Sequence, residues 1–550
     1  MRGLRLGAVL VFLSGMGCSL LLSTAEPTQC TGQRDCDANP ALRDRVCKDG
    51  FCVRPQEDPG QVSPPIDACS STEHCTLMNG GQASVCRKAG GPCIPLATGP
   101  CETIRGEWQG ADPIFIGTIL PLTANANGNV KSYPYSKRVQ RAMDLALAEL
   151  NAAVPEGLFF PNAPRRRFAL VHCDSSFDPA IAQIAMAHLT EVVGAHAVIV
   201  GSDHDLTAIR AKALEMQTSV VCSDCVAPFP SAPALAWRIV PPLANEAAMA
   251  AWRIGELEKQ LKSGATPPST LKVAILAAPD PAPAAFVSAL RDKLWFNGKT
   301  ASENGGAFLV RTAENAAVTT VKFEEHIAAL TAFEPDVLVV AMGADFPAEY
   351  LPSLEMGWTP TKAKPHYVMT ALNSEASPFE AVLGPDEDLR RRISGTRQAP
   401  DPAMRDHIES YELRYWEHSN FEHSDMDFSG YDAFYATAYA IAGAASASPV
   451  LDGPRIDAAF ARLRSGPRFE VGPAKLGAAL MRLAVPTESI DVHGLATHLD
   501  WDVTTRELTP VEVGLYCFER SGDGQIHVEL DTGPRMDPVT GEVRGVYACD

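Results

Sequence analysis

The 550-residue chain is poor in basic charge, in aromatic residues and in long apolar segments. Its formal net charge of -19 argues against a nucleic-acid partner, because phosphate binding needs a basic surface. Beyond the N-terminal segment no stretch of about 20 strongly apolar residues occurs, so we expect no membrane-spanning helix. The motifs G-x-S-x-G, H-E-x-x-H and G-x4-G-K-[ST] are also missing. The sequence therefore carries no signature of a serine hydrolase, a zinc protease or a P-loop NTPase.

The N-terminus has the features of an export signal, because two arginines precede an apolar run over residues 6–13. Two cleavage sites are possible in this signal. Cleavage after Ala25 would suit an ordinary signal peptidase and release a soluble periplasmic or secreted protein. The residues around Cys18 instead resemble a bacterial lipoprotein box, in which the cysteine is lipidated. We favour lipidation of Cys18, which would tether the protein to the envelope of a Gram-negative bacterium, with residues 1–25 as signal and anchor.

Fifteen cysteines favour an oxidising compartment. Residues 26–103 contain few hydrophobic residues and two copies of a cysteine pattern, in which each of the first three cysteines recurs 39 positions later. A segment without a sizeable core needs disulfides, and the close pairs of most zinc folds are missing here. Four cysteines per copy allow three connectivities, and the sequence does not choose between them. The eight predicted disulfide cysteines are Cys30, Cys36, Cys47, Cys52, Cys69, Cys75, Cys86 and Cys93.

Two other cysteine groups lie later in the chain. Cys517 and Cys549 flank a terminal β-rich segment, and we expect them to form a disulfide. The pair Cys222 and Cys225 forms a C-x2-C motif, which is either a redox pair or part of a structural bridge. We favour a bridge from this motif to one of two cysteines nearby in the fold, Cys173 and Cys101.

From residue 114 the chain alternates strands and helices. The apolar run Ile114–Leu120 predicts a buried strand, residues 123–136 a polar loop, and the next segment a helix with one apolar face. Further strands are expected at residues 167–173, 197–201, 219–222, 237–242, 271–276, 337–342 and 366–370, and β structure over 499–548. Helices are expected at residues 179–194, 205–217, 245–263, 284–296, 404–419 and 430–447. This alternation is typical of parallel sheets covered on both faces, and a fresh start after Pro241 suggests two lobes.

The ordered set of segments resembles the type I periplasmic solute-binding proteins, which include branched-chain amino acid receptors. The segments that carry the resemblance are IGTILPLT, RAMDLALAELN, AVIVGSDHDLTAIRAKAL, WRIVPPLANEAAMA, LKVAIL, PDVLVVAMGAD, ISGTRQAP and GYDAFYATAYAIAGA. The resemblance implies an α/β fold over residues 112–550, with two Rossmann-like lobes joined by three crossovers near residues 240, 398 and 485. The first lobe would comprise residues 112–240 and 399–485, and the second residues 241–398 and 486–550.

In such folds ligands bind beyond the carboxyl ends of the strands, where loops and helix N-termini present hydrogen-bonding groups. The resemblance assigns ligand contacts in the first lobe to the loop after the first strand, to the helix start after Gly201 and to the loop after Val221. In the second lobe it assigns them to the loops after three strands. The predicted ligand-binding residues are Tyr133, Tyr135, His204, Asp205, Cys225, Ala227, Asp280, Asp345 and Asn373.

Three departures from the family pattern bear on the ligand. Asp205 replaces a usual serine or threonine, and a carboxylate there would repel the carboxylate of an amino acid, although Asp205 serves equally well as a helix cap. An acid usual near Asn373 is missing, and prolines follow the LKVAIL strand. A cationic or neutral polar ligand is therefore as well supported as an amino acid. We expect no metal, because the spacing of His407, His418, His423, Glu422 and Asp425 fits no ligand geometry.

We predict a non-enzymatic, extracytoplasmic solute-binding lipoprotein without a cofactor. It would capture a small polar ligand, amino-acid-like or otherwise, between two lobes for an ABC-type permease or a sensor. The alternative is a surface-anchored interaction protein, in which the cysteine-rich module contacts a partner and the solute-binding fold is only a scaffold.

Overall fold

The computed structural model divides into two units, residues 1–66 and 67–550. It describes residue 34 and residues 46–48, 51–53, 69–87, 89–110, 112–126, 129–229, 235–313, 320–343, 346–358, 363–384, 386–421, 427–521, 525–529 and 533–547. The predicted signal, Cys18, Cys30 and Cys36 lie outside these residues. In the first unit, β1 (Val46–Lys48) pairs antiparallel with β2 (Phe51–Val53) and places Cys47 opposite Cys52. Cys47 is disulfide-bonded.

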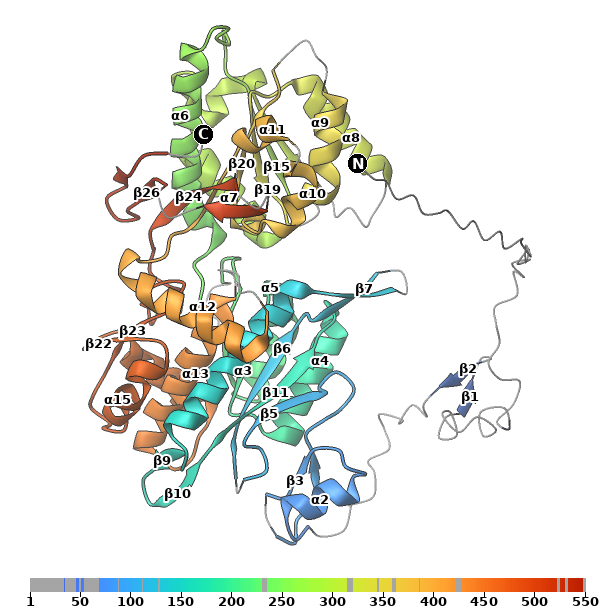
Figure 1. Cartoon of the computed structure of the whole chain (residues 1–550), viewed down its shortest axis with the longest axis vertical. Helices are drawn as coiled ribbons and strands as arrows, with labels where there is room; N and C mark the ends of the chain where they lie inside the picture. The colour runs from blue at the N-terminus through green and yellow to red at the C-terminus, as the bar shows by residue number, and fades with distance from the viewer. Residues whose placement is uncertain are drawn as a thin grey trace, which may run out of the picture. The chain divides into compact units, whose positions relative to one another are not determined.

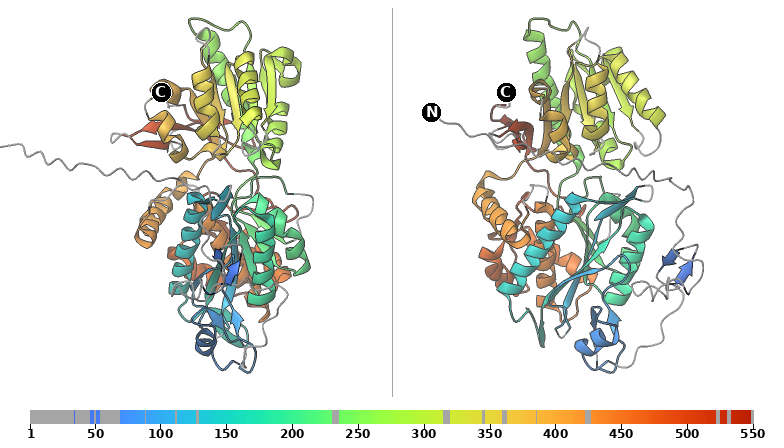
Figure 2. Two further views of the ribbon diagram at one scale, coloured as in Figure 1. Left: turned by 90° about the vertical axis from the view of Figure 1, so that its right-hand side faces the viewer. Right: turned by 45° about the vertical axis from the view of Figure 1, so that its right-hand side comes forward.

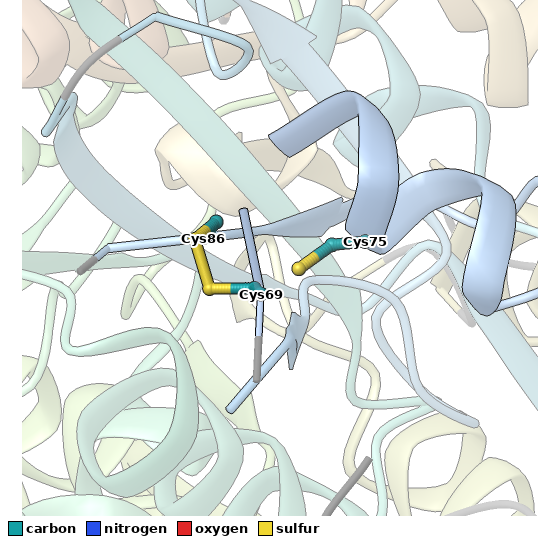
Figure 3. A group of neighbouring side chains, drawn as sticks. All are labelled: Cys69, Cys75 and Cys86. Carbon is teal, nitrogen blue, oxygen red and sulfur yellow. A yellow bond between two sulfur atoms is a disulfide. The ribbon is translucent and has the colours of Figure 1, made fainter. Parts of the chain in front are cut away.

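The second unit begins with a cysteine-rich segment. It consists of α2 (Thr72–Met78) and a hairpin of β3 (Ser84–Val85) and β4 (Ile94–Pro95). Cys69 bonds Cys86 (Figure 3), and Cys75 bonds Cys93. These bonds confirm disulfides over zinc for these four cysteines. The connectivity, left open by the sequence, is first to third and second to fourth. Val85 and Leu96 are buried in a core that this segment shares with the sheet that follows.

A six-stranded sheet with the order β14-β13-β12-β6-β11-β5 forms what we call the first lobe (Figure 1). All of its neighbouring strands are parallel except the edge strand β5, which runs antiparallel to β11. Its strands are β5 (Thr103–Gly106), β6 (Ile114–Leu120), β11 (Phe168–Asp174), β12 (Ala197–Val200), β13 (Ser219–Cys222) and β14 (Ala236–Arg238). Cys101, next to β5, is bonded to Cys173 in β11. Two hairpins project from the lobe, β7 (Thr123–Ala126) with β8 (Asn129–Ser132) and β9 (Leu158–Phe160) with β10 (Ala163–Arg166).

Helices cover both faces of this sheet (Figure 2). The predicted apolar stripe Val139, Ala142, Met143, Ala146 and Leu150 is buried on α3 (Pro134–Ala153), which packs beside α13 (Phe428–Ala447). The same face carries α12 (Arg405–Ser419), α14 (Gly453–Ala459) and α15 (Pro473–Leu483). The parallel pair β22 (Arg468–Glu470) and β23 (Asp491–His493) flanks α15 in the chain. The other face carries α4 (Pro179–Ala187), the π-helix η1 (His188–Val193) and α5 (Asp203–Glu215).

The second lobe is built on a nine-stranded sheet with the order β18-β15-β19-β20-β21-β24-β26-β27, with β25 paired to β24. The strands from β18 to β21 are parallel, and β24 joins β21 antiparallel. Its strands are β15 (Val273–Ala277), β18 (Phe308–Thr312), β19 (Val337–Ala341), β20 (His366–Met369), β21 (Ile393–Gln398), β24 (Val513–Arg520), β25 (Ile526–Glu529), β26 (Arg535–Met536) and β27 (Val543–Arg544). Its helices are α6 (Ala247–Ser263), α7 (Pro281–Lys293), α8 (Thr320–Phe333), α9 (Leu351–Gly357), α10 (Glu380–Leu383) and α11 (Glu387–Arg391).

The chain passes three times between the lobes. The first passage follows β14 at residues 239–242 and the second follows β21 at residues 399–401, close to the expected positions. The third comes later than the expected position near residue 485. Val492, Leu499, Trp501 and Leu508 still belong to the core of the first lobe, and the chain joins the second sheet only at Val513. The second and third passages contact each other through the Ala399 amide, which donates to the Glu512 carbonyl over 3.0 Å.

These observations confirm the predicted fold class of two α/β lobes with parallel sheets. Among the described helices, none combines the length and apolar character that crossing a membrane requires. The expected β structure after residue 499 begins only at β24, since Trp501 and Leu508 form no more than an isolated bridge. Cys517 is disulfide-bonded, but Cys549 lies outside the described residues, so their pairing stays a prediction.

Candidate ligand-binding cleft

Loops at the carboxyl ends of the strands of both lobes enclose a cavity of about 100 Å³. In each lobe the five parallel strands have the same order, with the first strand between the second and the third, so that neighbouring loops diverge and leave a crevice. The crossovers form part of the wall. The cavity is lined by Asp224, Val226, Val240, Pro241, Glu246, Ala371, Ser374, Arg397, Gln398, Pro400, Phe428, Ser429 and Ala496.

The first lobe contributes the Asp224 carboxylate to the wall of this cavity, and Tyr135, at the start of α3, lies next to Asp224 without lining the cavity itself. The Tyr135 hydroxyl interacts with the side chains of Asp224 and Ser429. Burial, together with the nearby carboxylates of Asp203 and Glu375, raises the pKa of Asp224 to about 7, against the lowering effect of the Tyr135 hydrogen bond. The charged groups that act on Asp224 are thus themselves anionic.

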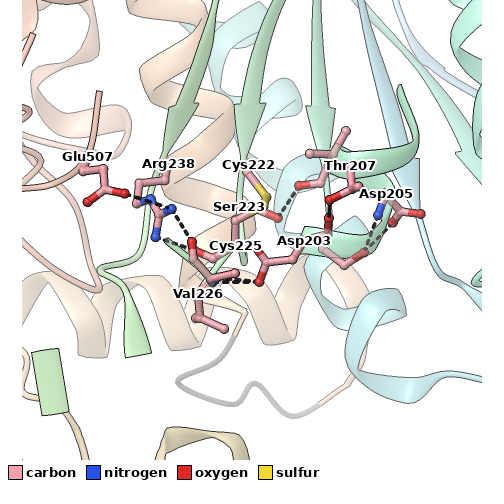
Figure 4. The surroundings of a disulfide bond; sticks show 12 residues. Asp203, Asp205, Thr207, Cys222, Ser223, Cys225, Val226, Arg238 and Glu507 are labelled. Carbon is pink, nitrogen blue, oxygen red and sulfur yellow. Dashed lines mark hydrogen bonds and ion pairs between the residues drawn. A yellow bond between two sulfur atoms is a disulfide. The ribbon is translucent and has the colours of Figure 1, made fainter. Parts of the chain in front are cut away.

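The loop that carries Asp224 is held from several sides (Figure 4). The Cys222–Cys225 disulfide closes a small ring around it. The Asp203 carboxylate, at the start of α5, accepts the amides of Val226 and Ala227, each over 2.9 Å. The fully buried Arg238 guanidinium donates to the carbonyls of Cys225, over 3.3 Å, and Ala227, over 2.5 Å. The backbone around Asp224 is therefore fixed before any ligand arrives.

The positive charge of Arg238 is balanced by a carboxylate of the same lobe, that of Glu507. Its guanidinium lies 3.4 Å from the Glu507 carboxylate and 4.0 Å from the centroid of the Phe229 ring. The Phe229 amide donates to Glu507 over 3.0 Å. A buried charge needs such partners, because an unpaired guanidinium in the interior would be very costly.

The second lobe contributes Glu246 and Arg397 to the cavity wall. Glu246 lies just before α6 and accepts the Ala371 amide over 3.0 Å and the Thr396 hydroxyl over 2.9 Å. Burial raises the pKa of Glu246 to about 8, although both hydrogen bonds and the Arg397 charge oppose that rise. At these values both acids of the cavity change charge near neutral pH.

One ion pair joins the lobes beside the cavity. Arg138 of α3, in the first lobe, pairs with Glu375, in the loop after β20 of the second lobe. A cross-lobe contact of this kind forms or breaks when the lobes rotate about the crossovers, so its energy contributes to the balance between open and closed states.

Comparisons with known proteins bear on this arrangement. A scan against protein-family models and a search of curated proteins each returned no match. Solved structures do match. The solute-binding protein of an ABC transporter from Rhodopseudomonas palustris BisB5, in complex with 3,4-dihydroxybenzoic acid, has a TM-score of 0.54 at 12% identity, over 78% of this chain and 98% of that one. The leucine-binding protein LivK from Thermotoga maritima MSB8 has a TM-score of 0.52 at 15% identity, over 76% and 97%.

A third structure, LivJ from Streptococcus pneumoniae in complex with isoleucine, has a TM-score of 0.52 at 12% identity and covers 76% of this chain and 99% of that one. The chain has the type I periplasmic-binding-protein fold. The three structures are named as a solute-binding, a leucine-binding and a substrate-binding protein.

Within the periplasmic-binding-protein fold, the predicted residues of the first lobe lie at different depths. Tyr135 lies next to Asp224 without lining the cavity, whereas Tyr133 is more exposed and contacts the Phe177 ring edge-on. His204 is exposed. Asp205 is fully buried, and its carboxylate accepts the Ser202 hydroxyl over 2.9 Å while its amide donates to that same hydroxyl over 3.1 Å. Asp205 therefore stabilises the start of α5.

The remaining predicted residues lie around the cavity rather than in it. Cys225 is buried in its disulfide, and Ala227 is held by Asp203. Asp280 is exposed at the start of α7, and its charge adds to the rise in the pKa of Asp203 that burial causes. The buried Asn373 amide donates to the Gly343 carbonyl over 3.1 Å. Asp345 lies outside the described residues.

The expected bridge from the C-x2-C motif to Cys173 or Cys101 is wrong. Cys222 and Cys225 bond each other, and Cys101 bonds Cys173. The edge strand β5 pairs with β11 and brings Cys101 to Cys173, which leaves the cysteines of the motif to each other.

None of the residues of the cavity wall was predicted from the sequence, and four of the polar ones matter most for the chemistry: Asp224, Glu246, Arg397 and Ser429. All four stand inside or beside segments that carried the family resemblance or the C-x2-C motif. A signal for Asp224 was its position between two cysteines at the end of a predicted strand, where a disulfide would fix an outward-facing carboxylate. Of the histidine group considered for a metal, His418 is exposed on α12, and His423, Glu422 and Asp425 lie outside the described residues.

Proposed function

We propose that this protein captures a small polar solute that carries an ammonium group, closing its two lobes around it without a catalytic step. The observation that carries the proposal is the Asp224 carboxylate, which lies in the cavity wall beside Tyr135 and among other acids. An ammonium group placed there would supply the counter-charge that the surrounding side chains do not.

The chemistry of the cavity favours an amine over an anion. A charged hydrogen bond to an ammonium group stabilises the ionised form of Asp224, whereas a ligand carboxylate next to it would repel it. Arg397 lies in the same wall, so a zwitterion that carries a carboxylate as well as an ammonium group also matches the charges. The solved neighbours bound to isoleucine and to 3,4-dihydroxybenzoic acid support small-molecule binding by this fold. The preference for an ammonium group rests on the loop of this chain that carries Asp224.

Closure would use the crossovers as hinges. Val240 and Pro241 of the first passage and Pro400 of the second line the cavity itself, together with Gln398 at the end of β21, so a ligand contacts the hinge directly. A ligand shifts the open–closed balance only by its difference in affinity for the two states. The Arg138–Glu375 pair adds to that difference, because it links the lobes at the edge of the cavity.

We further infer that the protein acts outside the cytoplasm and delivers its ligand to an ABC-type transporter or a sensor. The disulfides Cys69–Cys86, Cys75–Cys93, Cys101–Cys173 and Cys222–Cys225 support an oxidising compartment. One matching structure is the solute-binding protein of an ABC transporter and another is the substrate-binding protein of a branched-chain amino acid transporter, which supports a transporter as the partner. Lipid anchoring at Cys18 stays part of this proposal and rests on the sequence alone.

A thermal-shift screen at pH 8 and pH 6 tests the ligand class. Small primary amines and zwitterions should raise the melting temperature, because a ligand that binds only the folded state stabilises it by mass action. The effect should be larger at pH 8. With a pKa of about 7, Asp224 is mostly ionised at pH 8 and mostly protonated at pH 6, which predicts roughly tenfold weaker amine binding at the lower pH.

Simple carboxylates and neutral sugars serve as the comparison panel. Stabilisation by carboxylates alone, or an amine effect that grows on acidification, would contradict the assigned ligand class. A flat response to every class would favour a scaffold over a binding protein.

A further inference from the structure

Three side chains with metal-binding chemistry share one face of a short hairpin in the first lobe, far along the chain from the cavity-lining carboxylates. Asp491 and His493 are two positions apart on β23, so both point to the same face of the strand. His498 returns opposite His493 as its partner in an antiparallel bridge. The two imidazole rings stack with centroids 4.0 Å apart and an interplanar angle of 17°.

Both imidazoles are directed at one carboxylate. His493 Nε2 lies 3.2 Å from Asp491 Oδ2, and His498 Nε2 lies 2.7 Å from Asp491 Oδ1. The candidate ligand atoms of the three residues all lie within 4.8 Å of one another. Two imidazoles and one carboxylate are a ligand set that zinc accepts, with water completing a tetrahedral site. The His498 side chain is 40% exposed, which leaves a route for the ion and a place for the water.

Hydrogen bonds from the turn to α13 hold this hairpin in place. The fully buried Asp432 carboxylate of α13 accepts the amides of Leu495, over 2.8 Å, and Ala496, over 3.0 Å, inside the turn between the histidines. The Gly494 amide donates to the Thr497 carbonyl over 2.8 Å and closes the turn. A Cβ at Gly494 would lie 2.3 Å from the Asp432 carboxylate, so the turn has no room to shift. A preorganised backbone lowers the entropic cost of bringing ligands together.

Positive charge near the site is already balanced. Arg468 lies opposite Asp491 in the register of β22 and β23. Its guanidinium is engaged by Glu470, over 3.1 Å, and by Asp401, over 3.4 Å. Glu470 is also paired with Lys475 and stands opposite His493. The local acids thus offset the arginine that would otherwise oppose a cation.

We propose that Asp491, His493 and His498 bind one divalent transition-metal ion, with zinc the ion that this ligand set suits best. The shared carboxylate would exchange its two imidazole hydrogen bonds for the metal. Binding there would lock the turn that carries Ala496, a residue that also lines the cavity.

Zinc titration of the full chain, stripped of metal with a chelator, tests the site. Competition with a chromophoric zinc chelator should give one tight equivalent per chain. The change His498→Ala should weaken binding about 100-fold or more, since even the loss of residues that only support a metal ligand costs 10- to 100-fold. The change Asp491→Asn should weaken it in the same direction. The control is His418→Ala, an exposed histidine on α12, which should bind zinc like the parent protein.

The absorption spectrum of bound Co²⁺ gives a second test, because it would not change if the three residues only stabilised the fold. The parent protein loaded with Co²⁺ should show the visible absorption of a tetrahedral site, and His498→Ala should lose it. Circular dichroism confirms that each variant is folded, and Asp491→Asn replaces His498→Ala if the latter unfolds. The proposal is overturned if no saturable zinc binding occurs, or if both variants bind zinc as tightly as the parent.

Discussion

Replacement of Trp501 by alanine should lower the free energy of unfolding by about 3–5 kcal/mol, the range for large aromatic residues lost from a core. Trp501 is fully buried and packs edge-on against Trp237 and Phe460, which themselves stack with centroids 4.6 Å apart. Its indole Nε1 also donates to the Arg238 carbonyl over 2.6 Å. Removal of the ring would leave a cavity and an unpaired buried carbonyl. Urea denaturation followed by circular dichroism measures the change.

The control is Trp295→Ala, because Trp295 is 58% exposed in a two-residue strand. Surface substitutions of this kind usually change stability by no more than about 0.5 kcal/mol. If the two variants lose similar stability, the Trp501 cluster does not hold the first lobe as described. The cluster matters for function because the Arg238 carbonyl immediately precedes the first passage between the lobes, and the Arg238 guanidinium supports the Asp224 loop.

Removal of the Cys101–Cys173 disulfide, by changing both cysteines to alanine, should cost about 4 kcal/mol in the chain-entropy model. The bond joins residues 72 positions apart, so its loss frees a long loop in the unfolded chain. The matched control is the double alanine variant of Cys222 and Cys225, which are 3 positions apart and for which the same model gives about 2 kcal/mol. Both variants remove two buried sulfur atoms, so the difference between them reports loop length.

For ligand affinity we expect the opposite order: the variant that lacks Cys222–Cys225 should be affected more than the variant that lacks Cys101–Cys173. Asp224 lies inside the Cys222–Cys225 ring, so opening that ring should weaken amine binding, whereas loss of Cys101–Cys173 should leave it nearly unchanged in the folded protein. Equal stability losses would show that loop length does not set the contribution of these bonds. An unchanged affinity after opening of the small ring would show that the ring does not position Asp224.

Local patterns predicted most of the strands and helices. The apolar stripe on α3 and the continuous apolar strands β6, β12 and β19 could be predicted because each shows a pattern among consecutive residues of the sequence. The edge strand β5 was not predicted, because it has only four residues and is only half-buried, so that it shows no apolar pattern. Without β5 the pairing of Cys101 with Cys173 could not be inferred, since it follows from an antiparallel contact between distant segments.

The sequence pointed to the loops in which the cavity residues lie, but not to the residues themselves. Parallel topology places functional loops at the carboxyl ends of strands, and Val226, inside the predicted Cys225–Ala227 loop, does line the cavity, while the ligand contacts predicted from the sequence stay predictions. Which side chain points inward depends on the turn after the strand. There the disulfide ring and the Asp203 hydrogen bonds direct Asp224, rather than Cys225, toward the cavity. Asp205 illustrates the reverse case, because its helix-start role uses the carboxylate that we expected to contact a ligand.

Isothermal titration of the most stabilising amine at pH 8, with the parent protein and with Asp224→Asn, tests the central claim most directly. The claim predicts that the variant binds on the order of 10- to 100-fold more weakly, because an ionic hydrogen bond becomes a neutral one. The control Asp292→Asn, an exposed aspartate on α7, should bind like the parent. An affinity of Asp224→Asn equal to that of the parent, or tighter, would contradict the claim that this carboxylate holds a cationic ligand between the lobes.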